Sequence, residues 1–303
     1  MTTILISGGR GLIGTQLCAM LRAKGYKVNI LSRTNDLEAA YSVYKWNVDA
    51  QEMENEAVET ADFIIHLAGE NIGGERWTTK RQQVIIDSRV ASVKLLFDKV
   101  KGSSHKPKAF ISASAIGYYG AITTDHVYLE TDVAASDFLG ETCRKWEEAA
   151  NRFEEIGIRT VKIRTGVVLT RNGGALEKMK TPVKFGISSA LGSGKQFMPW
   201  IHIDDLCEIY IKAIEDEQMS GAYNAVAPEH KTNREFTKTL ASVLHKPFVF
   251  PNIPSFLLKL LFGRMSEMLL KGSRVSSEKI IKTGFRFRFP QLESALRNII
   301  KEA

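Results

Sequence analysis

The sequence contains little cysteine, and its three cysteines form no CxxC pair. An odd number of isolated cysteines does not suit a disulfide framework, which argues against a small disulfide-bonded secreted protein. The six histidines are not spaced as metal ligands, either with one another or with cysteine. We therefore expect a cytoplasmic protein without a metal centre.

Long hydrophobic runs are also absent. The first residues, MTTILISGG, lack the basic start and apolar stretch of a signal peptide, and the apolar run 256–262 is broken by Lys259. The net charge is +7, but the lysines and arginines are scattered, and no nucleic-acid-binding motif accompanies them. We expect neither a membrane nor a nucleic acid as partner.

What the chain does contain is enough apolar residues for a large core: 44% of its 303 residues are hydrophobic and 25% are charged. Its first two thirds alternate short β-branched runs with helical periodicity. Strands are expected at 3–7, 27–32, 63–67, 109–112 and 159–164, and helices at 11–24, 79–101 and 138–156. This alternation predicts an α/β fold, a Rossmann-type doubly wound parallel sheet with helices on both faces.

The pattern changes near residue 170, where glycine-rich loops begin and the chain becomes mostly helical. We predict a Rossmann domain over 1–170, to which elements of 198–227 return, and a smaller, mostly helical C-terminal substrate lobe over 171–303. In 285–290, phenylalanine alternates with arginine, which predicts a half-buried strand at the edge of that lobe.

The stretch ILISGGRGLIG carries a GxxGxxG array directly after a strand and at the start of a helix. Glycines there let the backbone turn tightly and approach a pyrophosphate, while the helix N-terminus offers free N–H groups. The predicted nucleotide contacts are Gly8, Arg10, Gly11, Leu12, Ile13 and Gly14. A tight turn without a ligand is the alternative.

The second expected strand ends in Ser32-Arg33-Thr34, where an NAD-binding chain would carry an acidic residue for the ribose hydroxyls. An arginine can instead pair with the 2′-phosphate of NADP. Arg33 therefore predicts NADP(H) as cofactor. Arg10 is either a second positive contact or an exposed arginine without a partner.

Three further segments, SASAIGYYG at 112–120, FMPWIHIDDL at 197–206 and GSRVSSEKIIKTGFRFRFP at 272–290, complete a family pattern. With the glycine array and His66-Leu67-Ala68-Gly69, the chain resembles an extended short-chain dehydrogenase/reductase. More narrowly it is similar to the atypical NAD-dependent epimerase/dehydratase-like subfamily with its own C-terminal domain. The resemblance implies a Rossmann fold, an NADP-type cofactor, contacts from Leu67, Ala68 and Gly69, and an unidentified small-molecule substrate.

The resemblance also implies a catalytic apparatus, and here the sequence departs from it. Extended reductases combine a serine with a Tyr-x-x-x-Lys pair, in which tyrosine moves a proton and lysine lowers its pKa and holds the ribose. Ser114 matches the serine and is the candidate for polarising a substrate carbonyl. Leu139 and Cys143 occupy the tyrosine and lysine positions, so the usual proton relay is missing.

Other residues near the serine remain candidates. Tyr118 and Tyr119 could supply the proton from a different direction, or they line the pocket. Arg164 corresponds to the segment beside nicotinamide and reaches either the substrate or a buried acid. His202 and Asp204-Asp205 either close the site or, as is commoner, bind loop backbone and cap the following helix.

Two functions are compatible with these residues. One is an NADP(H)-dependent oxidoreductase or epimerase of atypical mechanism. The other is a catalytically silent NADP(H)-binding regulatory or sensor protein, and an interaction protein with a vestigial nucleotide site is a third, more remote alternative. The sequence does not reveal the substrate or the reaction direction, and helix packing in related folds is compatible with a homodimer.

Overall fold

The structure is a computed structural model that describes residues 1–34 and 41–301. Its centre is an eight-stranded sheet whose neighbouring strands are parallel, except that β4 runs antiparallel to β3. From one edge to the other the strands are β11 (Gly221–Ala225), β8 (Arg159–Thr165), β6 (Ala109–Ala115), β5 (Phe63–His66), β1 (Thr3–Ser7), β2 (Lys27–Ser32), β3 (Ser42–Asn47) and β4 (Glu52–Met53).

The order of the strands reverses at β1. The chain first builds β2 and β3 on one side of β1, and then β5, β6 and β8 on the other. At such a reversal the connections leave in opposite directions, which opens a crevice at the carboxyl ends of the strands. The crevice beside β1 is therefore where this topology favours a ligand.

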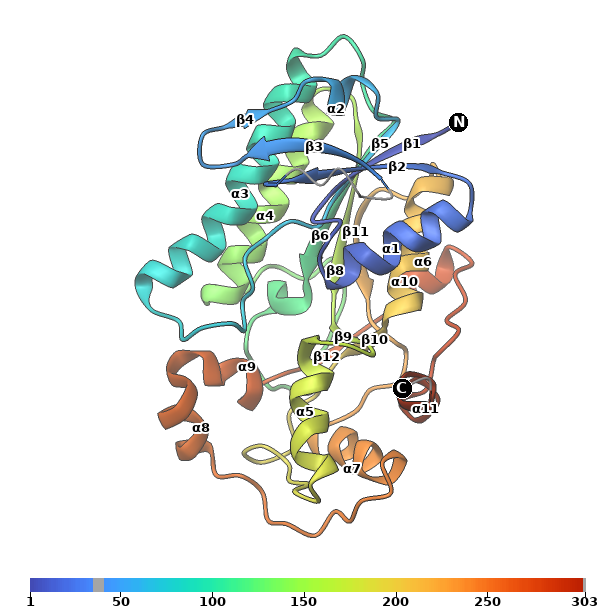
Figure 1. Ribbon diagram of the computed structural model, residues 1–303. Coiled ribbons are helices and arrows are strands. Elements are labelled where there is room, and N and C mark those ends of the chain that lie inside the picture. The colour runs from blue at the N-terminus through green and yellow to red at the C-terminus, as the bar shows by residue number, and fades with distance from the viewer. Residues whose placement is uncertain (35–40, 302–303) are drawn as a thin grey trace.

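Helices cover both faces of the sheet, so the predicted doubly wound fold is confirmed (Figure 1). The helices α1 (Leu12–Ala23) and α6 (Ile203–Glu215) pack on one face around fully buried Leu17 and Tyr210. The helices α3 (Thr79–Gly102) and α4 (Phe138–Glu155) lie side by side on the other. Here Phe110 and Phe153 stack with ring centroids 3.8 Å apart, which anchors α4 to β6.

Several helices gather below the sheet in Figure 1 and form the mostly helical lobe. Its core contains the fully buried Trp200 and Phe236.

The remaining helices of the structure are α2 (Glu56–Glu59), α5 (Gly174–Lys184), α7 (Asn233–Val243), α8 (Ser255–Phe262), α9 (Glu267–Leu270), α10 (Glu278–Lys282) and α11 (Leu292–Lys301), with 3₁₀ turns η1 (Ile116–Tyr119) and η2 (Gly263–Ser266). There are also two short pairs of parallel strands, β9 (Val167–Leu169) with β10 (Trp200–His202) and β7 (Val127–Tyr128) with β12 (Arg274–Val275).

Part of the chain after residue 198 lies in the main sheet, because β11 pairs with β8 at its edge. Not every expected element was right. The sequence analysis missed β3 and β4, and the strand expected at 285–290 is irregular backbone, although Phe285 and Phe289 are buried as their alternation predicts.

For the residues at the start of α6, the expected binding of loop backbone is confirmed by Asp205, but the expectation that Asp204 or Asp205 is the N-cap is wrong. His202 is the N-cap of α6 and accepts a hydrogen bond from the Asp204 backbone N–H, so the expected aspartate cap is wrong. The Asp205 carboxylate instead accepts the backbone N–H groups of Arg288 and Phe289, at 2.7 and 3.0 Å. Asp205 thereby satisfies two backbone N–H groups of the aromatic run.

Within residues 1–34 and 41–301, no helix is both long enough and apolar enough to cross a membrane.

Candidate functional site

The turn between β1 and α1 is built from glycines because no side chain fits there. Gly8 has a φ of +74°, and a Cβ on it would lie 2.9 Å from the backbone of Leu67 and Ala68. A Cβ on Gly14 would lie 2.2 Å from the Gly8 carbonyl oxygen. Gly8 thus lets the turn approach the segment after β5, and Gly14 lets the first turn of α1 approach the glycine turn.

The N-terminus of α1 faces the crevice without a side-chain cap. Gly11 is its N-cap residue, and no side chain accepts a hydrogen bond there. Uncapped N–H groups and the positive end of the helix dipole form a site for an anionic group such as a pyrophosphate. A cradle that a Cβ would fill, next to an open helix N-terminus, fits a dinucleotide.

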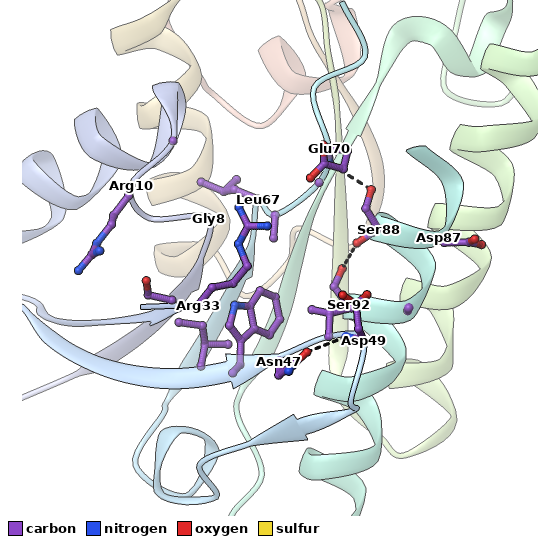
Figure 2. Close-up of a pocket in the computed structure, with 18 of the residues that line it drawn as sticks. Gly8, Arg10, Arg33, Asn47, Asp49, Leu67, Glu70, Asp87, Ser88 and Ser92 are labelled. Atoms are coloured by element: carbon purple, nitrogen blue, oxygen red, sulfur yellow. Dashed lines mark hydrogen bonds between the residues drawn. The ribbon is translucent and has the colours of Figure 1, made fainter. Parts of the chain in front are cut away.

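A cavity of about 730 Å³ opens at this point (Figure 2). In Figure 2, Arg33 lies on the β2 side of the pocket, and Ser88 and Ser92 line the opposite wall, which α3 forms. Its lining consists of Gly8, Arg10, Gly11, Leu31, Ser32, Arg33, Thr34, Trp46, Asn47, Val48, Asp49, Leu67, Ala68, Gly69, Glu70, Val84, Asp87, Ser88, Ala91 and Ser92.

The corner of the cavity at the end of β2 is basic and polar. Arg33 is exposed there, next to Ser32 and Thr34, and Nη1 of Arg10 donates to the Thr34 hydroxyl at 3.3 Å. No acidic residue occupies the three positions 32–34. Two guanidinium groups and two hydroxyls can bind an anion such as a phosphate, for which arginine provides paired donors.

Most of the predicted nucleotide contacts meet in this cavity: Gly8, Arg10, Gly11, Arg33, Leu67, Ala68 and Gly69. Leu12 instead lines a neighbouring cavity of about 460 Å³, on the other side of the turn. Ile13 and Gly14 line neither of the two cavities, and Gly14 packs beneath the turn. Their role as contacts remains a prediction.

Arg164 lies away from both cavities, in a buried ion pair. Nε and Nη2 of Arg164 each donate to the Glu147 carboxylate of α4 at 2.8 Å. Burial opposes the charge on Arg164, but the hydrogen bonds and charge of Glu147 outweigh it and raise the pKa of the guanidinium. Of the two partners that the sequence left open for Arg164, the structure shows the buried acid.

Ser114 belongs to the same network. It is opposite Arg164 in the register of β6 and β8, and its hydroxyl donates to Glu147 Oε1 at 2.7 Å. Polarising a substrate carbonyl requires the hydroxyl hydrogen, which Glu147 holds here. The role predicted for Ser114 therefore needs this hydrogen bond to be exchanged.

The two tyrosines differ in position. Tyr119 is buried, its hydroxyl donates to Asn224 Oδ1 at 2.7 Å and accepts from Arg164 at 3.0 Å, and burial raises its pKa to about 12. Tyr118 is half-buried, and its ring lies 3.4 Å from Arg164 Cζ. Tyr118 is thus the more accessible of the two predicted proton donors.

The positions of the missing pair on α4 hold groups without charge. Cys143 is buried, and burial raises the pKa of its thiol to about 12. The side chains of Leu139 and Cys143 pack under Gly117 of η1, where a Cβ would meet them at 3.4 and 3.6 Å. Cys143 is a packed thiol, as its place in a helix predicts.

The sequence analysis missed the walls of the cavity farthest from the glycine turn. One wall consists of the last two residues of β3 and the two that follow it, 46–49, and the other is the side of α3 that carries Val84, Asp87, Ser88, Ala91 and Ser92. The alternating aromatic and polar residues of SVYKWN, a strand pattern, were the available signal for the first wall. For α3 the family resemblance gave one signal, because Ser88-Arg89 occupies the region in which the family's asparagine helps organise the site, and Ser88 does line the cavity.

The chain matches two family models. The NAD dependent epimerase/dehydratase family covers residues 4–225, and a Domain of unknown function (DUF1731) covers residues 253–299. The mouse protein Epimerase family protein SDR39U1 is 34% identical over 300 residues, which is 98% of this chain and 99% of that protein. Epimerase family protein YfhF of Bacillus subtilis is 36% identical over 301 residues, 99% of this chain and 98% of its own.

Solved structures share the fold over the full length. The crystal structure of human epimerase family protein SDR39U1 with NADPH is similar with a TM-score of 0.91 at 34% identity, and the match covers 100% of both chains. Thermus thermophilus UDP-glucose 4-epimerase in complex with NAD is similar with a TM-score of 0.76 at 18% identity, covering 99% of this chain and 98% of that one. The second likeness, at its low identity, shows the fold alone.

Proposed function

The chain belongs to the NAD dependent epimerase/dehydratase family, and on this premise we propose that it binds NADP(H) and acts as an oxidoreductase or epimerase on a small molecule. One observation carries the choice of cofactor. The end of β2 presents Arg33 with two hydroxyl residues, and Arg10 joins it from the glycine turn. The relative whose structure contains NADPH is similar over the whole chain, which supports the same choice.

The residues fit the parts of this cofactor. The glycine turn and the uncapped start of α1 would hold the pyrophosphate, and Arg33 and Arg10 would bind the 2′-phosphate. When bound, the nicotinamide supplies or accepts a hydride. The chain has to orient the substrate and move the accompanying proton.

For that proton, Tyr118 is the candidate that the geometry favours. Tyr119 is held between Asn224 and Arg164, and its raised pKa opposes proton release near neutral pH. Tyr118 lies one residue away and is half-buried, with the Arg164 guanidinium 3.4 Å from the centre of its ring. The proton would thus come from Tyr118 of η1, because the tyrosine position of α4 holds Leu139.

A second candidate is favoured by the same network. If Ser114 keeps donating to Glu147 and Tyr119 stays buried, the chain binds NADP(H) without turnover, as a sensor or regulatory protein. Screening the NADPH-loaded protein against carbonyl compounds and sugar nucleotides separates the two. Substrate-dependent NADPH oxidation that Tyr118→Phe abolishes supports the enzyme, whereas no turnover with any compound supports the sensor.

The first experiment is a fluorescence titration with NADPH and NADH of the wild type, Arg33→Ala and Arg286→Ala. Arg286 is exposed on the loop before α11, so its removal controls for the loss of one positive charge. We expect the wild type to prefer NADPH, and Arg33→Ala to lose about ten- to a hundredfold in NADPH affinity, typical of a charged hydrogen bond. An equal loss in both variants contradicts the role of Arg33, and failure to bind either dinucleotide contradicts the function.

A further inference from the structure

The face of α4 that looks toward η1 carries no cation. Cys143 occupies its centre with an uncharged thiol, and Trp146 follows one turn later on the same face. A positive charge is nevertheless present there, because the Arg89 guanidinium of α3 lies 5.0 Å from the Trp146 ring. The charge of Arg89 also acts on the Cys143 thiol and lowers its pKa, against the larger effect of burial.

Arg89 reaches this position past the end of β5. Its Cζ lies 3.2 Å from the point that a Cβ on Gly69 would occupy, and its Nη2 donates to the Glu70 carbonyl at 3.1 Å. Gly69 and Glu70 both line the 730 Å³ cavity. The guanidinium therefore lies behind Gly69 and Glu70, between this part of the cavity wall and Trp146 of α4.

The charge of Arg89 has no counter-charge in contact. In residues 1–34 and 41–301 its guanidinium forms no salt bridge, and its hydrogen bonds go to the backbone carbonyls of Ile85 and Glu70. The carboxylate of Glu70 is taken by Arg81 at 3.2 Å. Burial lowers the pKa of Arg89, which shows that its surroundings desolvate the cation. Arg89 is thus partly buried and forms no ion pair with a described carboxylate, and only part of its five N–H donors binds backbone carbonyls, so it can bind a ligand rich in oxygen atoms.

On the basis of the proposed NADP(H) function, we propose that Arg89 is a third cofactor-binding arginine besides Arg33 and Arg10, which holds the ribose and phosphate oxygens on the nicotinamide side. Arg33 binds at the adenosine end of the cavity, and Arg89 lies behind the loop after β5, beside Trp146 of α4. The positive charge that α4 lacks at Cys143 is thus supplied by Arg89 of α3. With Leu139 and Cys143 on α4 the site lacks the usual proton relay, but the Arg89 guanidinium still provides a cation that holds the cofactor.

Arg89 also holds the loop after β5, so its structural role has to be separated from ligand binding. Arg81 is the matched control, because it comes from the same helix and fixes the same loop through Glu70 Oε2 and the Asn71 carbonyl, at 3.2 and 2.9 Å. Arg89→Gln and Arg89→Met remove the charge, Arg89→Lys keeps it, and Arg81→Met loosens the loop alone.

The experiment compares the affinities of each variant for NADPH and for 2′,5′-ADP, which carries the 2′-phosphate but no nicotinamide half. We expect the neutral Arg89 variants to bind NADPH about tenfold more weakly, with unchanged 2′,5′-ADP affinity. Arg89→Lys should recover part of the loss, and Arg81→Met should bind both ligands like the wild type. Arg33→Ala, in contrast, should weaken both ligands.

Three outcomes overturn the proposal: unchanged NADPH affinity in a neutral Arg89 variant, an equal loss for both ligands, or the same loss in Arg81→Met. Thermal unfolding identifies which neutral variant is folded. If neither is, Arg89→Lys carries the test: weaker NADPH binding at constant 2′,5′-ADP affinity supports the proposal, and any other result refutes it. A wild type that binds neither ligand refutes the proposed function instead.

Discussion

His66, the last residue of β5, should make the stability of this protein depend on pH. Its side chain is fully buried, and Nε2 lies 2.8 Å from the Ser92 hydroxyl. Ser92 Oγ donates to carbonyl oxygens of α3 at 2.7 and 3.0 Å, so it accepts from the imidazole. Burial, followed by the charge of Arg89, lowers the pKa of His66 to about 3. The folded protein therefore contains a neutral imidazole.

The magnitude follows from proton linkage. The unfolded chain takes up a proton on His66 below its ordinary pKa of 6.5, while the folded chain does not until pH about 3. Because the unfolded state binds more protons, the stability that is present above pH 6.5 is lost as the pH falls from 6.5 toward 3. From about pH 7.5 to about pH 5.5 this residue should lower the free energy of unfolding by about 1.4 kcal/mol.

Urea unfolding at these two pH values tests the prediction in the wild type and in His66→Gln, whose amide does not titrate. Each protein is compared with itself, so a general destabilisation by the substitution cancels. We expect the pH-dependent loss to be smaller in His66→Gln by the amount given above. Ser92→Ala is the control: it removes the hydrogen bond but leaves the imidazole buried, so it should keep the pH dependence. An equal loss in His66→Gln and the wild type would refute the reasoning.

Two further predictions concern the glycine turn and the buried ion pair. Gly14→Ala places a Cβ 2.2 Å from a backbone oxygen, so we expect a lower melting temperature and loss of NADPH binding in a titration. Gly102→Ala, at the end of α3 with no atom within 4 Å of the added Cβ, should leave both unchanged or raise stability slightly. Glu147→Gln leaves Arg164 charged and without its carboxylate, and should cost about 3–5 kcal/mol in urea unfolding. Glu141→Gln, on the same helix, removes a half-buried carboxylate that pairs with Arg144 and Lys145 at the surface and should cost much less, and equal effects of the two would contradict the buried role.

Patterns of neighbouring residues were sufficient to predict the main strands and helices and the side of the cavity formed by the glycine turn and the end of β2. The order strand, glycine turn, helix is written in consecutive residues, so Gly8 and Gly11 could be placed at the cavity from the sequence. Arg33 was equally accessible, because the end of β2 follows from the length of one apolar run. Of the two missed strands, β4 has only two residues at the edge of the sheet, too few for a periodic pattern, whereas the alternation in β3 was present in the sequence and was overlooked.

Side-chain partners across the fold were not accessible in this way. Ser114, Glu147 and Arg164 come from β6, α4 and β8, and only the register between the strands and the packing of α4 bring them together. The sequence therefore offered Ser114 and Arg164 as groups facing a ligand, while the structure binds both to a buried carboxylate.

The sequence by itself determined the doubly wound α/β class, the glycine turn and the arginine at the end of β2, because each depends on neighbouring residues and on chain periodicity. Only the tertiary structure decided which charges are paired. It binds Arg164 in a buried ion pair, and among residues 1–34 and 41–301 it places no carboxylate in contact with the Arg89 guanidinium. The reason is physical: whether a charge is neutralised depends on groups within a few ångströms of it, and here those groups come from segments far apart in the chain.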